Sequence, residues 1–310
     1  MGLRSRCGIC GGSCVEVGVK RGEVNRRQFH LMRCDACFYS FVADPWTDFA
    51  EIYSRDYYHG KGADPTVDYV FELENPSNTV RIYEWQGILK AVRSLIHISK
   101  DTRWLDFGCG NGGLVRYCLD KGGCEAVGFE EGWIAPVARE KGIPIMNERE
   151  LASAEGQFDV VTAIEVLEHS TTPLETLRRI RRLLRPGGLF LYTTGNAERY
   201  RRNLLKWSYF VPEMHVGLFE PRTLETALKL TGFRPEFRSL LPGYTDIIRF
   251  KLLKSLGVRE RAVWEQLVPW QIVSRLVDWR AGITAHPIGW AAGAEERPEP
   301  ASAAPTKATP

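Results

Sequence analysis

Four cysteines near the start of the chain form two Cys-x-x-Cys pairs, a spacing typical of metal sites. The pairs are Cys7 with Cys10 and Cys34 with Cys37, and the stretch between them is long enough for a two-stranded ribbon. Two such pairs on β-turns place four thiolates tetrahedrally around zinc. A redox pair would need a thioredoxin-like βαβ pattern beside it, which is absent here. The spacing therefore predicts a structural zinc ion bound by Cys7, Cys10, Cys34 and Cys37.

The remaining cysteines do not extend this pattern. Five of the eight cysteines lie before residue 38, and such clustering in a long chain favours a metal site over a disulfide framework. We therefore expect a reducing, cytoplasmic setting. Cys14 is a possible fifth thiol of the site or a spare one, and the spacing leaves both open. Cys109, Cys118 and Cys124 fit buried apolar positions.

A glycine-rich segment in the middle of the chain has the residue types of a nucleotide-binding loop. Residues 105–113 follow an expected strand and open an expected helix, and their glycines let the backbone turn sharply and approach a ligand. Glu130 ends the next strand, where a carboxylate can accept hydrogen bonds from both ribose hydroxyls. Gly108, Gly110 and Gly113 also satisfy the dinucleotide pattern. The loop alone leaves open an NAD site or a tight turn with no ligand.

Two further features favour another cofactor. Asp106 precedes the first glycine at the end of the strand, where it could orient the loop and meet a ligand's amino group. Residues 158–169 form a later strand and its exit, followed by a helix and by the sequence Arg-Pro-Gly-Gly at 185–188. In this order, the motifs resemble the class I S-adenosylmethionine (SAM)-dependent methyltransferases. The likeness is greatest to the group that includes ubiquinone-biosynthesis-type O-methyltransferases and sugar methyltransferases, and it covers roughly residues 104–233.

The resemblance implies a role for each matched residue of the first two strands. Asp106, Gly108, Cys109 and Gly110 match the loop that holds the methionine part of SAM. Glu130 matches the acid that binds the ribose of SAM.

It also implies roles at the ends of the third and fourth strands. After the third strand the family has an acidic residue near the adenine amine, which here is Asn147 or Glu148. Ile164 and Glu165 match the end of the fourth strand, which lines the cofactor. For Ile164, an ordinary core position is the alternative.

The cysteine module resembles the N-terminal zinc ribbons of some SAM methyltransferases in sugar and secondary metabolism. In those sequences the ribbon runs into a tyrosine-rich linker similar to residues 52–58 of this chain. Aromatic side chains serve two uses here, and both stay open. They could dock the ribbon onto the core, or they could form a lid over the methyl donor, in which case Tyr58 belongs to the active site.

Two histidines are placed to assist methyl transfer. Transfer from a sulfonium is an in-line displacement, in which the enzyme aligns donor and acceptor and excludes water, and a hydroxyl acceptor also benefits from a general base. His169 follows the fourth strand, on the carboxyl edge of the expected sheet, where ligands bind. His215 follows the fifth strand, where such enzymes place acceptor-binding elements. An ordinary structural role is the alternative for both, so the candidate catalytic residues are His215, His169 and Tyr58.

The elements that must position these residues alternate between strands and helices. This alternation predicts an α/β fold with a doubly wound, Rossmann-like, mostly parallel sheet and right-handed crossovers. Apolar strands are expected at 104–107, 126–129, 143–146, 160–164 and 189–193, with helices at 77–97, 113–121, 133–141 and 173–184. A helix at 222–231 and a strand at 233–240 should follow.

We divide the chain into five parts. They are a zinc-ribbon module (1–43), an irregular aromatic linker (44–76), a SAM-binding methyltransferase domain (77–250), a helical extension (251–294) and a tail (295–310). The tail is dominated by Ala, Pro, Ser and Thr and is expected to be disordered.

Composition limits the partners. The net charge is +3, and no run of eighteen apolar residues occurs, so we expect no membrane span and no strong polyanion partner. The arginines of 178–185 decorate an expected helix whose leucines face the sheet, which is typical of a solvated surface.

The sequence thus predicts a SAM-dependent methyltransferase that modifies a small molecule, at a hydroxyl or carbon of a sugar or related metabolite. Two other classes remain as alternatives. One is a nucleic-acid methyltransferase with the ribbon as its reader, although the fourth strand ends Ile-Glu-Val-Leu and not in an Asn-Pro-Pro-aromatic motif. The other is a non-catalytic scaffold that binds SAM without turnover.

Overall fold

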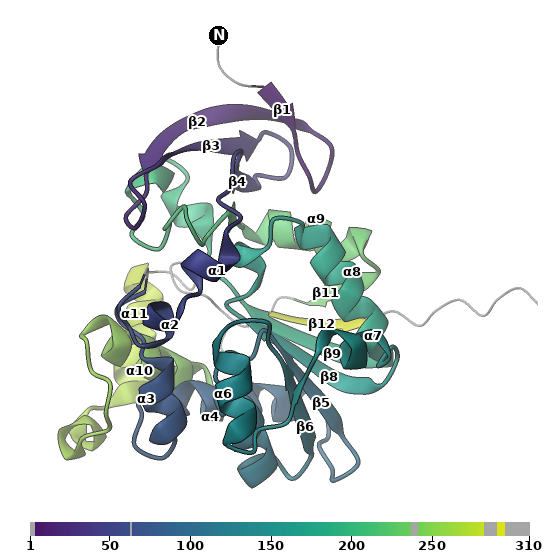
Figure 1. Ribbon diagram of the computed structural model, residues 1–310, viewed down its shortest axis with the longest axis vertical. Coiled ribbons are helices and arrows are strands. Elements are labelled where there is room, and N and C mark those ends of the chain that lie inside the picture. The colour runs from purple at the N-terminus through teal and green to yellow at the C-terminus, as the bar shows by residue number, and fades with distance from the viewer. Residues whose placement is uncertain (1–3, 63, 237–240, 282–289, 295–310) are drawn as a thin grey trace, which may run out of the picture.

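A mostly parallel β-sheet forms the centre of the molecule, and a smaller antiparallel sheet lies over one end of it (Figure 1). The structure is a computed structural model that describes residues 4–62, 64–236, 241–281 and 290–294. The strands are β1 (Arg4–Arg6), β2 (Ser13–Arg21), β3 (Gln28–Cys34), β4 (Ser40–Val42), β5 (Arg103–Phe107), β6 (Glu125–Phe129), β7 (Ile145–Met146), β8 (Phe158–Ile164), β9 (Leu184–Thr193), β10 (Gly217–Leu218), β11 (Phe233–Glu236) and β12 (Trp290–Ala294). The α-helices are α1 (Phe49–Ile52), α2 (Arg55–Tyr58), α3 (Tyr69–Glu74), α4 (Ile82–Leu95), α5 (Gly113–Tyr117), α6 (Ile134–Glu140), α7 (Glu148–Ala152), α8 (Pro173–Leu183), α9 (Pro221–Leu230), α10 (Tyr244–Ser255) and α11 (Trp270–Ala281).

The strand order of the large sheet creates a ligand-binding edge. Its seven strands run in the order β11-β12-β9-β8-β5-β6-β7. The strands from β9 through β7 pair in parallel, whereas β12 is antiparallel to both β9 and β11. From β5 the chain proceeds to one side through β6 and β7, and then returns to the other side through β8 and β9. Ligands of open α/β sheets bind outside the carboxyl ends of the strands at such a switch point. The predicted fold class is confirmed.

The two faces of this sheet are covered by different helices. Leu105 and Val161 lie in one core cluster with Leu177 of α8, whereas Trp104 and Val160 lie in another with α4 and α10. Adjacent residues of a strand point to opposite faces, so one apolar run supplies both cores. The outer surface of α8 carries its arginines, as the pattern of that helix predicts.

Several elements differ from the expected ones. The 44–76 linker is not irregular throughout, because α1, α2 and α3 lie within it, and Asp48 and Asp68 cap α1 and α3 through their side chains. The expected helix at 77–97 is shorter, because α4 begins at Ile82. The expected strand at 143–146 is reduced to the two residues of β7. The expected strand at 233–240 is described only as β11, and residues 237–240 lie outside the described ranges.

The C-terminal extension is only partly helical. Helices α10 and α11 are as expected, but β12 inserts between β9 and β11 and completes the large sheet. Small, weakly patterned residues in Trp290–Ala294 gave no strand signal, because their partners in the sheet, and not their own side chains, determine the strand. The expected disordered tail, 295–310, lies outside the described residues.

The ribbon module shares its sheet with the large domain. Its strands run in the order β1-β2-β3-β4-β10, and β10 comes from the segment that follows β9. Gly217 pairs with Phe41 and Leu218 with Ser40. The N–H of Val42 also donates to the carbonyl of Val216 at 2.9 Å. The ribbon therefore packs on residues 204–223 of the methyltransferase domain. The tyrosine-rich linker contributes no strand to the small sheet.

Candidate active site

The four predicted zinc ligands lie together in the ribbon. The Sγ atoms of Cys7 and Cys37 are 3.6 Å apart, and those of Cys10 and Cys34 are 3.4 Å apart. Four thiolates at about 2.3 Å from a tetrahedral zinc ion would be about 3.8 Å from one another. Backbone N–H groups of Ile9, Gly12 and Ala36 point at three of the sulfurs, each at 3.4 Å.

The group accordingly fits a tetrahedral metal ion. All four ligand atoms lie within 4.8 Å of one another. Cys14 is buried but is not a member of this group, and its thiol points at the carbonyl of Gly12. Four sulfur ligands leave no open coordination position, so such a metal would have a structural and not a catalytic role.

The glycine loop has the backbone conformation that only glycine adopts without strain. Gly108 has φ 75° and Gly110 has φ 54°, both in the left-handed region. A Cβ on Gly108 would lie 2.6 Å from Val166, and one on Gly110 would lie 3.1 Å from the ring of Tyr69. The loop leads into α5, with Gly112 as its N-cap.

Glu130 lies at the end of β6, beside the glycine loop. Its Oε2 accepts a hydrogen bond from the N–H of Gly110 at 2.9 Å, and its Oε1 accepts one from Gly132 at 2.6 Å. Burial raises the pKa of Glu130 above its ordinary value, while these two N–H groups act in the opposite direction. The ends of β5 and β6 thus position the glycine loop and Glu130 together as one unit.

Asp106 is buried beneath the loop. The hydroxyl of Thr162 donates to its Oδ1 at 2.8 Å, and the indole of Trp104 donates to the same hydroxyl at 2.9 Å. Burial raises the pKa of Asp106 to about 7, against the lowering effect of the Thr162 hydrogen bond. A cationic amino group in the adjacent cavity would therefore find a carboxyl that ionises readily in its presence.

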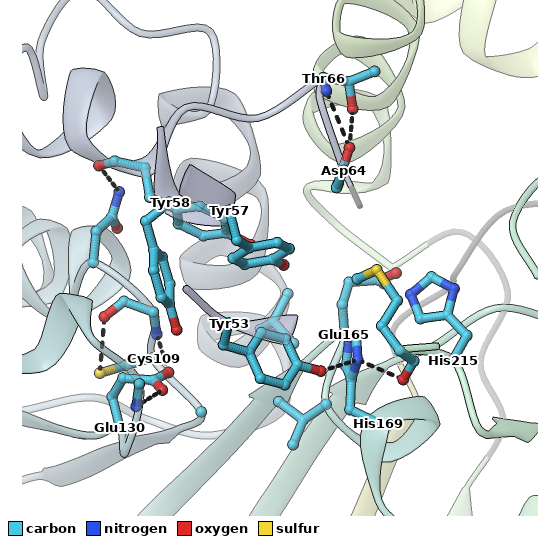
Figure 2. A pocket seen from close by; sticks show the side chains of 18 of the residues that line it. Tyr53, Tyr57, Tyr58, Asp64, Thr66, Cys109, Glu130, Glu165, His169 and His215 are labelled. Carbon is cyan, nitrogen blue, oxygen red and sulfur yellow. Dashed lines mark hydrogen bonds between the residues drawn. The ribbon is translucent and has the colours of Figure 1, made fainter. Parts of the chain in front are cut away.

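These residues line one large cavity at the carboxyl edge of the sheet (Figure 2). The cavity measures about 1410 Å³. It includes Asp106, the loop from Gly108 to Gly110, and Glu130 on one side, and His169 and His215 on the other. Tyr58 and the other linker tyrosines also line it.

Ile164 and Glu165 form the part of the cavity that β8 supplies. Glu165 has φ 55°, an unusual value for a non-glycine residue, and is held there by several contacts. Its Oε1 accepts from Thr193 at 2.8 Å, its Oε2 accepts from the phenol of Tyr209 at 3.0 Å, and the ammonium of Lys251 lies 3.6 Å away. A strained backbone conformation that several contacts hold in place is frequent at functional sites.

Glu168 lies beneath the cavity wall and is almost fully buried. It accepts a hydrogen bond from Thr194 at 2.7 Å, and its other oxygen lies within hydrogen-bond distance of the phenol of Tyr209. Burial, with the Glu165 carboxylate close by, raises the pKa of Glu168 to about 8. With His169 and His215 it forms a group whose ligand atoms lie within 4.8 Å of one another.

The two histidines come together although they are far apart in the sequence. Their ring centroids are 4.9 Å apart. The Nδ1 of His215 donates to the carbonyl of Tyr209, and the Nδ1 of His169 lies 3.0 Å from the carbonyl of Met214. Because a carbonyl only accepts, the ring of His215 is assigned the Nδ1–H tautomer with an unprotonated Nε2. The Nδ1 of His169 also lies 2.8 Å from the phenol of Tyr53, which can donate or accept. Burial lowers the pKa of His169 to about 3 and that of His215 to about 4, so both are neutral at physiological pH.

Asn147 and Glu148 do not join this cavity. Asn147 caps α7 and accepts from the N–H of Glu150 at 3.0 Å, while Glu148 forms an ion pair with Arg179 at 2.5 Å. Neither is among the residues that line the 1410 Å³ cavity. Their assignment to the adenine stays a prediction.

Cys109 and Tyr58 both lie in the cavity wall. Cys109 is buried, and burial raises the pKa of its thiol, so it remains protonated. The phenol of Tyr58 lies against Gly132 and Glu130, since a Cβ on Gly132 would be 1.8 Å from the phenol oxygen. Tyr58 is thus nearer to the residues predicted for the donor than to the two histidines.

Sequence reasoning missed two residues of the site. Tyr209 bridges Glu165 and Glu168, and the only signal for it is its place in the aromatic run before His215. Lys251 pairs with Glu165 and with Glu84 at 3.3 Å. It comes from α10, where no motif distinguishes it from any surface lysine.

Comparison with known proteins assigns the family. A model of the methyltransferase domain matches residues 79–236, slightly more than half of the chain. The chain therefore belongs to this methyltransferase family, and its fold and motifs are those of the class I SAM-dependent group. No described helix is long and apolar enough to cross a membrane.

Curated relatives cover only part of the chain. The ubiquinone biosynthesis O-methyltransferase of Ruegeria pomeroyi is 43% identical over 104 residues, which are 30% of this chain and 41% of that protein. The malonyl-[acyl-carrier protein] O-methyltransferase of Enterobacter lignolyticus is 29% identical over 165 residues, 50% of this chain and 64% of that protein. The chain thus spans about two fifths to two thirds of the length of these relatives.

A solved structure shares the fold over a longer range. The Haemonchus contortus phosphoethanolamine N-methyltransferase 2, in complex with phosphomonomethylethanolamine and S-adenosylhomocysteine, aligns with a TM-score of 0.51. The alignment covers 95% of this chain and 72% of that one at 17% identity. At this identity the likeness supports the fold alone.

Proposed function

We propose that this protein transfers a methyl group from SAM to a small molecule, at a hydroxyl oxygen or a carbon of a sugar or related metabolite. One observation carries the proposal: the glycine loop, Glu130 and the paired histidines share a cavity of about 1410 Å³, which has room for a donor and an acceptor together. The two curated relatives are named as O-methyltransferases, which supports an oxygen acceptor.

The donor half of the site would be held by the ends of β5 and β6. The left-handed turn at Gly108 and Gly110 is one that side chains rarely adopt, and a Cβ there would meet Val166 and Tyr69 of the cavity wall. Glu130 would accept hydrogen bonds from the ribose, and Asp106 would orient the amino group of the methionine part. When bound, SAM supplies an electrophilic methyl group on a positively charged sulfur.

The acceptor half would be formed by the segment after β9 and by the exit of β8. The unprotonated Nε2 of His215, or an unprotonated ring nitrogen of His169, could accept the proton that a hydroxyl loses. Their low pKa values make them weak bases, so their larger contribution would be to orient the acceptor in line with the methyl group. Tyr58 would close the donor side of the cavity against water.

A pair of glycine variants tests the donor site. Gly110→Val should abolish SAM binding in calorimetry, because a side chain is strained at this φ of 54° and meets the ring of Tyr69 in the cavity wall. Gly156→Val is the matched control: Gly156 has a similar φ of 69°, but a Cβ there has open space around it. Equal SAM affinity in both variants would refute this site.

An acceptor panel then separates the alternatives. With radiolabelled SAM, the wild type should methylate hydroxylated small molecules. A salt-dependent gel shift with nucleic acid, and methylation of it, would favour the nucleic-acid class. Cofactor binding without product on any acceptor class would favour the scaffold.

We also propose that the four cysteines bind one structural zinc ion, and that the ribbon holds the acceptor segment in place. The sulfur spacings support the metal, and the β4–β10 pairing supports the second role. Removing residues 1–43 would take away Phe29 and Leu31 and expose Trp207 and Phe210, which pack with them in one apolar cluster. The truncated protein should bind SAM but lose acceptor turnover and solubility.

A further inference from the structure

Four tyrosines of the linker form one wall of the large cavity. They are Tyr53, Tyr57, Tyr58 and Tyr69, and all four line the cavity. Tyr57 lies at the centre: its ring centroid is 5.2 Å from that of Tyr53 and 5.0 Å from that of Tyr58, both at nearly right angles. Tyr69 packs behind, 5.8 Å from Tyr57 and 5.5 Å from Tyr58. The wall is a continuous aromatic surface.

This wall extends from the donor residues to the acceptor residues. At one end, the phenol of Tyr58 abuts Gly132 and Glu130. At the other end, the phenol of Tyr53 is 2.8 Å from the Nδ1 of His169 (Figure 2). If Glu130 binds the ribose and the histidines face the acceptor, the sulfur that carries the methyl group must lie between these ends. It then lies beside the tyrosine rings, whose faces carry the negative end of the quadrupole.

The rings present neutral aromatic surface and not charge. Burial raises the pKa of each phenol, to about 12 for Tyr69 and higher for the other three. The guanidinium of Arg81 already stacks 5.4 Å from the ring centre of Tyr69, and it is ion-paired with Glu72 and Glu84. The ring of Tyr69 is therefore already in contact with a cation, the guanidinium of Arg81. Among the described residues, the rings of Tyr53, Tyr57 and Tyr58 have no such contact.

We propose that Tyr53, Tyr57 and Tyr58 form an aromatic cage that recognises the positive charge of the SAM sulfonium and discriminates against the neutral product S-adenosylhomocysteine. The inference rests on the proposed function. In the transfer, the methyl–sulfur bond breaks, the methyl–acceptor bond forms, and the sulfur keeps the electron pair and becomes a neutral thioether. The attraction between cation and ring is then lost, which favours release of the product.

Calorimetry with three ligands tests the cage on the full-length protein. The ligands are SAM, S-adenosylhomocysteine, and sinefungin, which has an ammonium group in place of the sulfonium. Tyr53→Leu and Tyr58→Leu remove a ring, whereas Tyr53→Phe and Tyr58→Phe keep the ring and lose only the hydroxyl. A cation–π contact of about 0.5–2 kcal/mol corresponds to about a 2- to 30-fold change in relative affinity.

The expected result is a change in ligand preference and not merely in affinity. In the Leu variants, the affinity for SAM and sinefungin relative to S-adenosylhomocysteine should fall about 2- to 30-fold, and in the Phe variants it should stay within about twofold. Tyr200→Leu is a matched control, because Tyr200 also lines the cavity but stacks on Trp207, away from this wall. Thermal unfolding of each variant verifies the fold, and the less buried Tyr53 serves as the second position if Tyr58→Leu does not fold.

Two outcomes would overturn the proposal. If the Leu variants lose affinity for all three ligands equally, the wall contributes only shape and the cage is refuted, while the SAM site stands. If Tyr200→Leu changes the preference as much as Tyr53→Leu does, charge recognition does not belong to these rings. If the wild type binds none of the three ligands, the proposed function itself fails, and this result is distinct from the other two.

Discussion

Replacing Glu213 by leucine should loosen the tip of the β2–β3 hairpin from the segment that carries His215. Glu213 is buried, with an exposed fraction of 1%. Its Oε1 accepts hydrogen bonds from the backbone N–H groups of Val24 at 2.8 Å and Asn25 at 3.3 Å. A Cβ on Gly22 would be 2.2 Å from this oxygen, so the hairpin tip closes directly over the carboxylate. The side chain is thus one polar contact between the hairpin tip and the segment that carries His215, beside Lys20 of β2, whose ammonium donates to the carbonyls of Trp207 and Phe210.

The contacts fix the size of the expected effect. Hydrogen bonds to a charged group contribute about 1.5–3 kcal/mol each, and the 3.3 Å bond belongs at the low end. The second oxygen, Oε2, has no hydrogen-bond partner in the part of the chain that the structure describes. Removing this oxygen therefore breaks no hydrogen bond, and it removes the free-energy cost of burying an unpaired polar atom. A net loss of about 2–3 kcal/mol would raise the equilibrium constant for hairpin opening by about 30- to 150-fold.

Hydrogen exchange measures this opening directly. In Glu213→Leu, peptides that cover 22–27 and 207–216 should exchange faster, while peptides from β5 and β6 should not change. SAM affinity should stay within about twofold, because none of the loop or ribose residues contacts Glu213. Glu213→Gln is the matched control: it keeps an acceptor oxygen of the same shape and should retain most of the protection. Unchanged exchange in the leucine variant, or an equal loss of SAM binding, would refute this role of Glu213.

Two other predictions concern the metal and the pH dependence. Cys34→Ser should lower the zinc content from about one ion per chain and reduce the unfolding temperature. Cys14→Ser should keep the zinc, because of these two cysteines only Cys34 belongs to the four-sulfur group. Equal zinc loss in both variants would contradict the assignment. The pKa of Glu168 is about 8 in the folded protein and about 4.3 when unfolded. The folded state therefore holds an extra proton between these values, and stability should fall as pH rises from about 4 to 8, by at most about 1.4 kcal/mol per pH unit. Glu168→Gln should flatten this dependence in denaturant titrations, and an unchanged slope would show that Glu168 is not its source.

Much of the fold, and the place of the glycine loop and Glu130 in the cavity, could be predicted, because they depend on local sequence. The turn at Gly108–Gly110 needs left-handed backbone, which glycine alone adopts freely, and Glu130 ends an apolar strand at a fixed place in a βαβ unit. The two Cys-x-x-Cys pairs specify their cluster in the same way, since each pair closes a local turn. Such patterns can be recognised from a few neighbouring residues of the sequence.

The acceptor half could not be predicted with the same detail, because it is assembled from distant segments. His169 and His215 meet only through the packing of the segment after β9 against the exit of β8. Lys251 reaches Glu165 from a helix of the C-terminal extension, and nothing in the pattern of that helix marks it. For the same reason β12 was not foreseen, since a strand of small residues is determined by the partners between which it inserts.

We propose that the ribbon acts mainly on the side of the cavity that carries His169 and His215. Arg33 of β3 and Arg201 of the segment after β9 both bind the fully buried carboxylate of Glu220, each at 2.6 Å. Separating the ribbon would remove Arg33 and leave the buried carboxylate of Glu220 with Arg201 as its one remaining arginine partner, which is costly. Glu130 and the glycine loop, by contrast, are held by β5 and β6, which make no sheet pairs with the ribbon. Substitutions in the ribbon can therefore change how the acceptor is held without changing the donor residues, and the test is that acceptor KM and SAM affinity vary independently across ribbon variants.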